Sequence, residues 1–171
     1  MAASKYLSLL SGRIREVVAT VVSGGAGSDG ALVALDATGR LDNSVLPVGI
    51  GQETKSIVSS ENISASSLVN VWNDAGTPKV RNADATASGK EANGFVLAGV
   101  TSPAAATVYF EGTVTGLSGI VAGTRYYLSQ STPGNATPTV PSSSGNVVQY
   151  IGTGISSSEL SFEPTDGVIL A

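Results

Sequence analysis

Histidine and cysteine are both absent from this chain of 171 residues. Without them the chain cannot form a Ser-His-Asp or Cys-His catalytic group, a histidine- or cysteine-ligated zinc site, an iron–sulfur cluster or a disulfide. Catalysis by paired carboxylates remains open, because it needs neither residue. The stability of the protein must come from packing or from the association of several chains.

Charged residues are scarce, at 13 % of the chain against about 25 % in an ordinary globular protein. The net charge is −4, and the nine Lys and Arg residues are scattered singly. Nucleic-acid binding requires a basic patch, so we expect no nucleic-acid partner. No apolar run approaches the ~18 residues of a membrane span, and the N-terminal apolar stretch is too short for a secretory signal. We therefore expect a soluble protein, made in a cytosol, with no membrane partner.

Aromatic residues are also few, at 5 %, so the core must be built from Val, Ile, Leu and Ala. The 21 glycines and the many Ser and Thr residues favour short strands and turns. The apolar pattern predicts strands at Ser56–Val58, Leu68–Trp72, Lys79–Arg81, Phe95–Val100, Thr107–Thr115, Arg125–Ser129, Val147–Gly152, Glu159–Phe162 and Val168–Leu170. We expect a mainly β protein, with a small antiparallel β-barrel or sandwich over about residues 54–171.

Residues 4–22 follow a different pattern. Apolar residues recur there at steps of three and four, which is the spacing of a heptad seam: Leu7, Leu10, Ile14, Val17 and Val21. The spacing predicts a short amphipathic helix within residues 1–23, capped by Ser4 and ended by Ser23-Gly24-Gly25. Such a helix either packs on its own domain or joins chains that a larger domain already holds together.

The next segment, residues 24–53, is predicted to be a glycine-rich joint followed by an extended arm with a short strand at 31–36. Its glycines lack the Gly-Lys-Ser/Thr ending of a phosphate loop. Asp36 and Asp42 flank a glycine, but the alternating ligands and late Glu of an EF-hand are missing. We therefore expect no cofactor and no metal.

The carboxylates offer no clear catalytic pair. Almost all of them lie in predicted turns, and Glu111, the one inside a well-defined strand, lies on its polar side. No pair is bracketed by apolar residues that would raise one pKa, so we expect no enzyme activity. Four aromatic residues could form a sugar-stacking platform, although core or interface anchoring is the more common use of such residues: Trp72, Tyr126, Tyr127 and Tyr150.

A family resemblance runs through residues 67–171. It is carried, in order, by Leu68–Trp72, Lys79–Asp84, Glu91–Val96, Gly112–Gly119, Ala122–Ser129, Thr132-Pro133-Gly134, Pro138–Pro141, Val147–Gly152 and Leu160–Phe162. This succession resembles a small β-domain of tailed-bacteriophage virions, found in capsid decoration (cement) proteins and in related fibre modules. The stretch from Asp29 to Pro47 resembles connectors of trimeric phage fibre and capsid-attached proteins.

The resemblance implies a mechanical role without catalytic residues. We expect a capsid decoration protein, acting as a homotrimer, that binds the phage major capsid protein on the virion exterior after assembly in the host cytoplasm. The expected contacts to other copies or to the capsid are Leu7, Leu10, Ile14, Val17, Val21, Leu32, Leu35, Leu41 and Leu46. Two alternatives remain: a trimeric tail-fibre or head-fibre subunit that contacts the host surface, and a carbohydrate-binding module.

Overall fold

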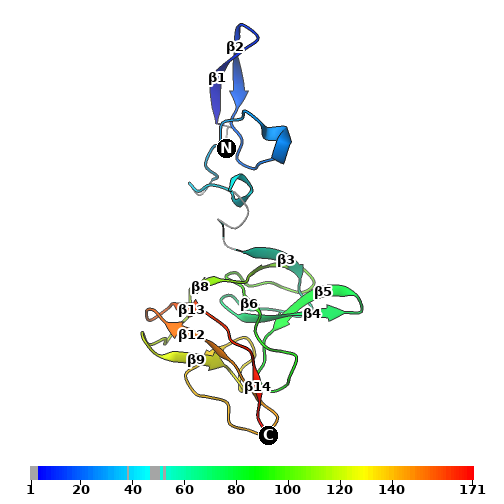
Figure 1. The fold of residues 1–171 in the computed structure, drawn as a ribbon, viewed down its shortest axis with the longest axis vertical. Coiled ribbons are helices and arrows are strands. Elements are labelled where there is room, and N and C mark those ends of the chain that lie inside the picture. The colour runs from blue at the N-terminus through cyan, green and yellow to red at the C-terminus, as the bar shows by residue number, and fades with distance from the viewer. Residues whose placement is uncertain (1–3, 38, 47–50, 52) are drawn as a thin grey trace. The chain divides into compact units, whose positions relative to one another are not determined.

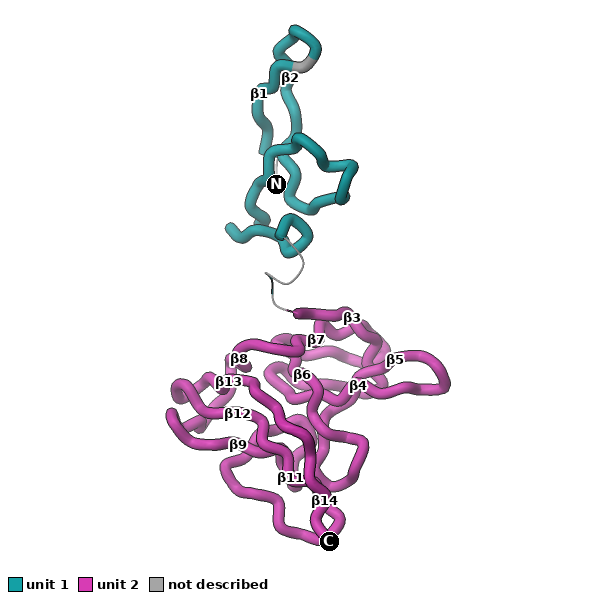
Figure 2. The backbone as a smooth tube through the Cα atoms, in the orientation of Figure 1, with its two compact units in different colours: residues 1–51 teal, residues 52–171 magenta. Residues whose placement is uncertain are grey.

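The computed structural model describes residues 4–37, 39–46, 51 and 53–171. The chain divides into two compact units, unit 1 (residues 1–51) and unit 2 (residues 52–171), which are coloured separately in Figure 2. Regular structure in the described residues is almost entirely antiparallel strand, which confirms the mainly β expectation (Figure 1).

Unit 1 begins with a β-hairpin. Strand β1 (Lys5–Leu10) pairs with β2 (Arg13–Val18), so that Lys5 lies opposite Val18 and Leu10 opposite Arg13. Ser11 and Gly12 form the two-residue loop with φ of 52° and 76°, which is the sign pattern of a type I′ turn. The amphipathic helix predicted for residues 1–23 is therefore wrong.

The residues of this segment explain why the hairpin forms. Leu7 and Leu9 alternate with Ser8, which fits a strand as well as the three-four spacing fits a helix. The β-branched residues of β2 favour an extended backbone. Gly12 would weaken a helix by up to ~1 kcal/mol, whereas it suits the positive φ of the hairpin loop.

The rest of unit 1 has little regular structure. It contains two short 3₁₀ turns, η1 (Gly25–Ser28) and η2 (Asn43–Val45). The strand predicted at 31–36 is wrong, because only an isolated parallel bridge joins Thr20 and Val33. In that bridge the Thr20 N–H donates to the Leu32 carbonyl at 2.8 Å, and the Ala34 N–H donates to the Thr20 carbonyl at 2.8 Å.

Unit 2 contains two five-stranded antiparallel sheets and a separate strand pair. The first sheet has the order β3 (Thr54–Val58), β7 (Ala105–Tyr109), β6 (Gly94–Phe95), β4 (Leu68–Asp74) and β5 (Thr77–Asn82). The second has the order β10 (Ala136–Thr137), β9 (Arg125–Leu128), β12 (Tyr150–Gly154), β13 (Leu160–Phe162) and β8 (Gly112–Val114). Strand β11 (Val147–Val148) pairs with β14 (Val168–Ile169). Among the described residues no barrel is closed.

Two predicted strands are each divided between sheets. The segment 107–115 forms the end of β7 in the first sheet and then β8 in the second. The segment 147–152 is interrupted at Gln149, between β11 and β12. The strand predicted at 95–100 ends at Phe95. Between β7 and β8 the two-residue break preserves the alternation of buried side chains, so the apolar pattern alone does not reveal the break.

The hydrophobic core of unit 2 lies on both faces of the first sheet. On one face, Leu68 and Phe95 pack with Leu128, Ile151 and Leu160 of the second sheet. The other face carries a cluster composed of Ile57, Ile63, Val69, Val80, Val96, Ala106 and Val108. Phe95 and its neighbour Val96 belong to different clusters, which explains why this run is apolar on both faces.

Candidate functional site

Unit 1 has no hydrophobic core of its own. None of its residues whose burial is described is buried, whereas every member of both core clusters belongs to unit 2. Ordering a backbone costs about 1–2 kcal/mol per residue, and burial of apolar surface is the main term that offsets this cost. Unit 1 therefore needs apolar contacts beyond those that it makes within itself.

One face of the β-hairpin in unit 1 carries a group of exposed apolar side chains. Side chains at alternate positions of β1 and at their cross-strand partners point to the same side of the sheet. Four exposed side chains thus share a face, which we call the hairpin apolar face: Leu7 (73 % exposed), Leu9 (71 %), Ile14 (73 %) and Val18 (52 %). Lys5 and Glu16 form an ion pair on this same face.

The opposite face of the hairpin is more polar. It carries the cross-strand pairs Tyr6–Val17 and Ser8–Arg15. Tyr6, Ser8 and Val17 are half-buried there, while Arg15 is exposed. Among the side chains that the structure describes, the two faces therefore differ in both polarity and exposure, and the exposed aliphatic ones lie on the hairpin apolar face.

The energy available from covering this face is large for so small an element. Full burial of one Val, Leu or Ile side chain contributes about 1.5–3 kcal/mol, so the four together offer roughly 6–12 kcal/mol before ordering costs. An isolated two-stranded hairpin is at best marginally stable in water. A partner surface on the hairpin apolar face would supply the missing stability.

The structure brings together only some of the predicted contact residues. Leu7 and Ile14 share the hairpin apolar face, but Val17 lies on the opposite face. Val21 follows β2 and is half-buried. The backbone of Leu10 pairs with Arg13, while its side chain lies outside what the structure describes. The five residues therefore do not form the single seam that a helix would have given them.

Leu9 and Val18 complete the hairpin apolar face and were missed by the helical interpretation. The signal in the sequence is the Leu7-Ser8-Leu9 alternation, followed after Leu10 by the turn residues Ser11-Gly12. In the arm, Leu32, Leu35 and Leu41 are exposed, at 55 %, 56 % and 49 %, and Leu46 is half-buried.

Hydrogen bonds, rather than a core, connect the distant parts of unit 1. The Ser44 hydroxyl accepts from the Ser23 N–H at 2.8 Å, which ties η2 to the segment after the hairpin. The Asp42 carboxylate caps η2 by accepting from the Ser44 N–H at 2.9 Å. Hydrogen bonds from Ser44 lower the pKa of Asp42 below its ordinary value. The side chain of Ser44 has the larger effect on this pKa and its backbone N–H the smaller.

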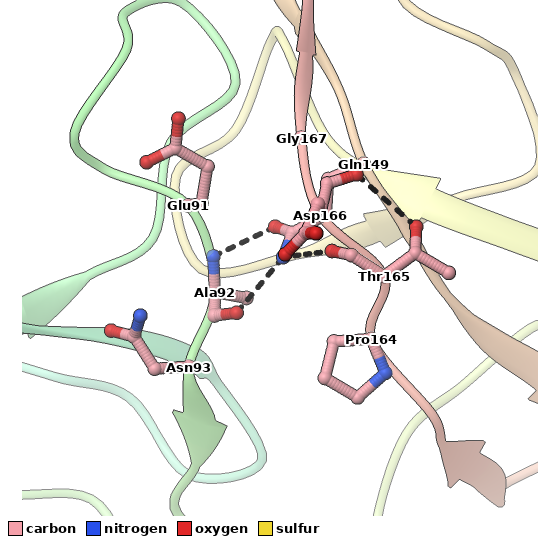
Figure 3. A pocket seen from close by; sticks show the side chains of 8 residues that line it. All are labelled: Glu91, Ala92, Asn93, Gln149, Pro164, Thr165, Asp166 and Gly167. Carbon is pink, nitrogen blue, oxygen red and sulfur yellow. Dashed lines mark hydrogen bonds between the residues drawn. The ribbon is translucent and has the colours of Figure 1, made fainter.

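Unit 2 contains a cavity of about 450 Å³ whose lining includes Glu91, Gln149 and Asp166 (Figure 3). The amide of Gln149 is fully engaged in it: Oε1 accepts from the Ala92 N–H at 2.8 Å, and Nε2 donates to the carbonyls of Ala92 at 2.9 Å and Thr165 at 3.1 Å. Within the described residues no buried polar side-chain atom lacks a partner, and no cluster of three or more Asp, Glu, His or Cys could hold a metal ion. The cavity is thus a structural junction.

The four aromatic residues considered for a sugar platform are divided between the two sheets. Trp72 lies on β4 of the first sheet, whereas the three tyrosines lie on β9 and β12 of the second. Tyr126 is buried, and its hydroxyl accepts from the Val121 N–H at 2.9 Å. Tyr127 and Tyr150 meet edge to face with centroids 6.1 Å apart. A joint platform of all four is therefore not formed.

The described residues include no helix that is long and apolar enough to cross a membrane. Comparison with known proteins adds no relative: no protein-family model matches the chain, and no curated protein matches it. The case for a function therefore depends on the surfaces described above.

Proposed function

We propose that this chain is a structural virion protein of a tailed bacteriophage, a capsid decoration protein that binds the outer capsid surface as a homotrimer. In this role the protein would bridge neighbouring capsomers and resist the outward pressure of the packaged DNA. The resemblance of residues 67–171 to virion β-domains supports this class of protein. The different packing of the two units supports separate roles for unit 1 and unit 2 within such a protein.

The observation that carries the proposal is the contrast between a coreless unit 1 and a well-packed unit 2. Unit 2 has two clusters of buried apolar residues. Unit 1 exposes Leu7, Leu9 and Ile14 at more than 70 % each. A segment of this kind is typical of chains that become fully ordered by covering a large partner surface.

We assign the hairpin apolar face to contacts between copies of the chain, and the arm residues Leu32, Leu35, Leu41 and Leu46 to contacts with the major capsid protein. Soluble homo-oligomers close around a symmetry axis, so that each copy presents the same patch to its neighbour. Three hairpins around one axis would cover one another's apolar faces. The trimeric state follows the resemblance of residues 29–47 to connectors of trimeric phage proteins.

The same connector resemblance supports a second candidate, a trimeric fibre subunit that contacts the host surface. A fibre subunit would use an identical self-association interface, so the oligomeric state does not separate the two roles. The number of copies on the particle does separate them, because a capsid lattice offers many equivalent sites and a fibre attaches at few.

The test is the copy number of the chain in purified virions, measured by quantitative mass spectrometry against the major capsid protein. The decoration role predicts hundreds of copies per particle, together with density on the outer shell in electron micrographs. A few to a few dozen copies would instead support the fibre role. Absence of the chain from purified particles would refute both.

A further inference from the structure

A second surface, on unit 2, has the composition of a ligand site. A cleft of about 570 Å³ lies beside the β4–β5 hairpin, where Trp72 meets the charged and amide side chains of Glu61, Arg81, Asn82, Asp84 and Lys90. Trp72 is the single tryptophan of the chain and is half-buried. The cleft thus combines one large aromatic ring with polar side chains that exchange hydrogen bonds readily.

The tryptophan is held in place by a chain of contacts. The guanidinium of Arg81 stacks over its ring, with 4.8 Å between the guanidinium carbon and the ring centroid. Arg81 Nε donates to the buried Asn70 at 2.9 Å, and Nη2 donates to the Gly89 carbonyl at 2.8 Å. Asn70 is itself fixed, because its amide donates to the Glu91 carbonyl at 2.7 Å. The ring is therefore preorganised, which reduces the ordering cost of binding.

The charges of the cleft are balanced within it. Lys90 lies 3.7 Å from Asp84, and Arg81 is occupied by the amide and carbonyl oxygens just described. Glu61 accepts from the backbone N–H of Asn82 at 2.8 Å and from its side-chain amide at 2.7 Å. A site for phosphate or a polyanion would need an excess of positive charge. The cleft instead suits an uncharged ligand.

We propose that the Trp72 cleft binds a neutral oligosaccharide. A pyranose ring presents an apolar face of C–H bonds, which packs on an aromatic ring, and a rim of hydroxyl groups that both donate and accept hydrogen bonds. Trp72 supplies the aromatic ring through the face that the Arg81 guanidinium does not cover. The carboxylates of Glu61 and Asp84 accept from hydroxyls, while the ammonium of Lys90 donates to them. The side-chain amide of Asn82 is not counted among the donors, because both its N–H groups are used by Glu61 and by the Asn62 carbonyl. This binding activity does not depend on the capsid role.

The single tryptophan provides a direct assay. The full-length protein is titrated with five neutral hexasaccharides, namely those of cellulose, starch, chitin, xylan and β-mannan, while Trp72 emission is followed. At least one sugar is expected to give a saturable change in emission with a Kd of about 1 mM or lower, matched by calorimetry. An anionic heparin hexasaccharide is expected to bind more weakly than that sugar.

Variants locate the binding in the cleft. Trp72→Ala and, at the rim, Lys90→Ala are each expected to weaken binding at least about fivefold in calorimetry, with circular dichroism confirming the fold. The matched control is Arg125→Ala, an exposed arginine that lies over Tyr150, with 5.6 Å from its guanidinium carbon to the ring centroid, on the second sheet. It should bind like the unaltered protein.

Three results would overturn the proposal: no saturable response to any of the five sugars up to about 10 mM, unchanged affinity in both cleft variants, or tighter binding of the heparin fragment. The capsid role is tested separately by copy number. Sugar binding by a chain absent from virions would refute the capsid role and leave this site standing.

Discussion

At the scale of single residues, Gln149 contributes to the stability of unit 2. It is the single residue that separates strand β11 from strand β12. Its buried amide pairs with both the N–H and the carbonyl of Ala92, as a neighbouring strand would, and adds a bond to the Thr165 carbonyl. Ala92 is itself buried and lies 57 positions earlier in the chain. One side chain thus pairs with both backbone groups of a buried residue.

Gln149→Leu should destabilise unit 2 by roughly 2–5 kcal/mol, because it leaves the buried N–H and carbonyl of Ala92 unpaired, at about 1–3 kcal/mol each. Chemical denaturation of the full chain measures this. The matched control is Gln130→Leu, which removes a half-buried amide that accepts from Ser142 and Asn146. It should cost no more than about 1 kcal/mol. Equal effects of the two changes would contradict the role given to Gln149.

Asp42 gives unit 1 a pH dependence of known sign. Because hydrogen bonding from Ser44 lowers the folded-state pKa of Asp42, its contribution to stability is present above the unfolded value of about 3.9. That contribution disappears as the pH falls through the lower, folded-state value. In an NMR titration the carboxyl carbon of Asp42 should titrate below about pH 3.9, and in Ser44→Ala its midpoint should rise. A midpoint unaffected by Ser44→Ala would show that the cap has no influence.

At the scale of elements, the β1–β2 hairpin is the part of the molecule most dependent on a partner. It is a two-stranded sheet with a polar face and an apolar face, and the apolar face is the more exposed. Contact between this face and the same face of other copies would bury its exposed aliphatic side chains without any change in unit 2. In the proposed function this element would therefore hold the copies of the chain together.

Replacing the cross-strand pair Leu9 and Ile14 by threonine should abolish self-association. Both substitutions keep β-forming residues but remove apolar burial of about 1.5–3 kcal/mol each, which weakens association at least a hundredfold. Sedimentation velocity measures the loss. The control replaces the neighbouring pair Ser8 and Arg15, on the opposite face, by threonine and should leave the oligomer intact. Persistence of the oligomer in the Leu9/Ile14 variant would rule out the hairpin apolar face as the interface.

The sequence predicts correctly those elements whose apolar pattern fits only one kind of secondary structure. The strands expected at Leu68–Trp72 and Lys79–Arg81 are confirmed, because β-forming residues lie on both sides of a turn at Ala75-Gly76 and pair across it. The hairpin was misassigned because the spacing of Leu7 and Ile14 satisfies a heptad as well as two paired strands. Leu7 and Ile14 are contact candidates in either interpretation, since exposure of Leu and Ile is unfavourable in both structures, whereas Leu9 and Val18 are found only with the strand alternation.

The Trp72 cleft was beyond sequence reasoning for a different reason. The sequence suggests a sugar platform of Trp72 with three tyrosines, but those tyrosines lie on the other sheet. Its actual neighbours come from separate segments, because Glu61 follows β3 and Lys90 precedes β6. Only the pairing of β4 with β5, and the bridge from Ser59 to Val80, brings them to one place.

At the scale of the whole molecule, charge and apolar exposure are distributed unevenly between the units. Unit 1 is electrically balanced, with Lys5, Arg13, Arg15 and Arg40 against Glu16, Asp29, Asp36 and Asp42. The net charge of −4 therefore resides in unit 2. The proposed association through unit 1 would therefore bring together surfaces of no net charge, whereas the net negative charge of unit 2 would oppose close contact between copies of that unit.

Self-association should accordingly be insensitive to salt. Exposed ion pairs such as Lys5–Glu16 contribute about 0–1 kcal/mol and are screened by salt, whereas apolar burial persists. We expect the association constant to change less than about threefold between about 0.05 and 0.5 M NaCl, as measured by sedimentation equilibrium. A decrease of more than about tenfold would mean that ion pairs, rather than the hairpin apolar face, hold the chains together.

The central claim, that unit 1 is completed by other copies of the chain, is tested most directly by the mass of the full-length protein in solution. Multi-angle light scattering at a concentration of about 10 μM detects any association with a micromolar or lower Kd. The account predicts a single species of three times the chain mass of 17.0 kDa. A mass of 17.0 kDa across the accessible concentration range would contradict it.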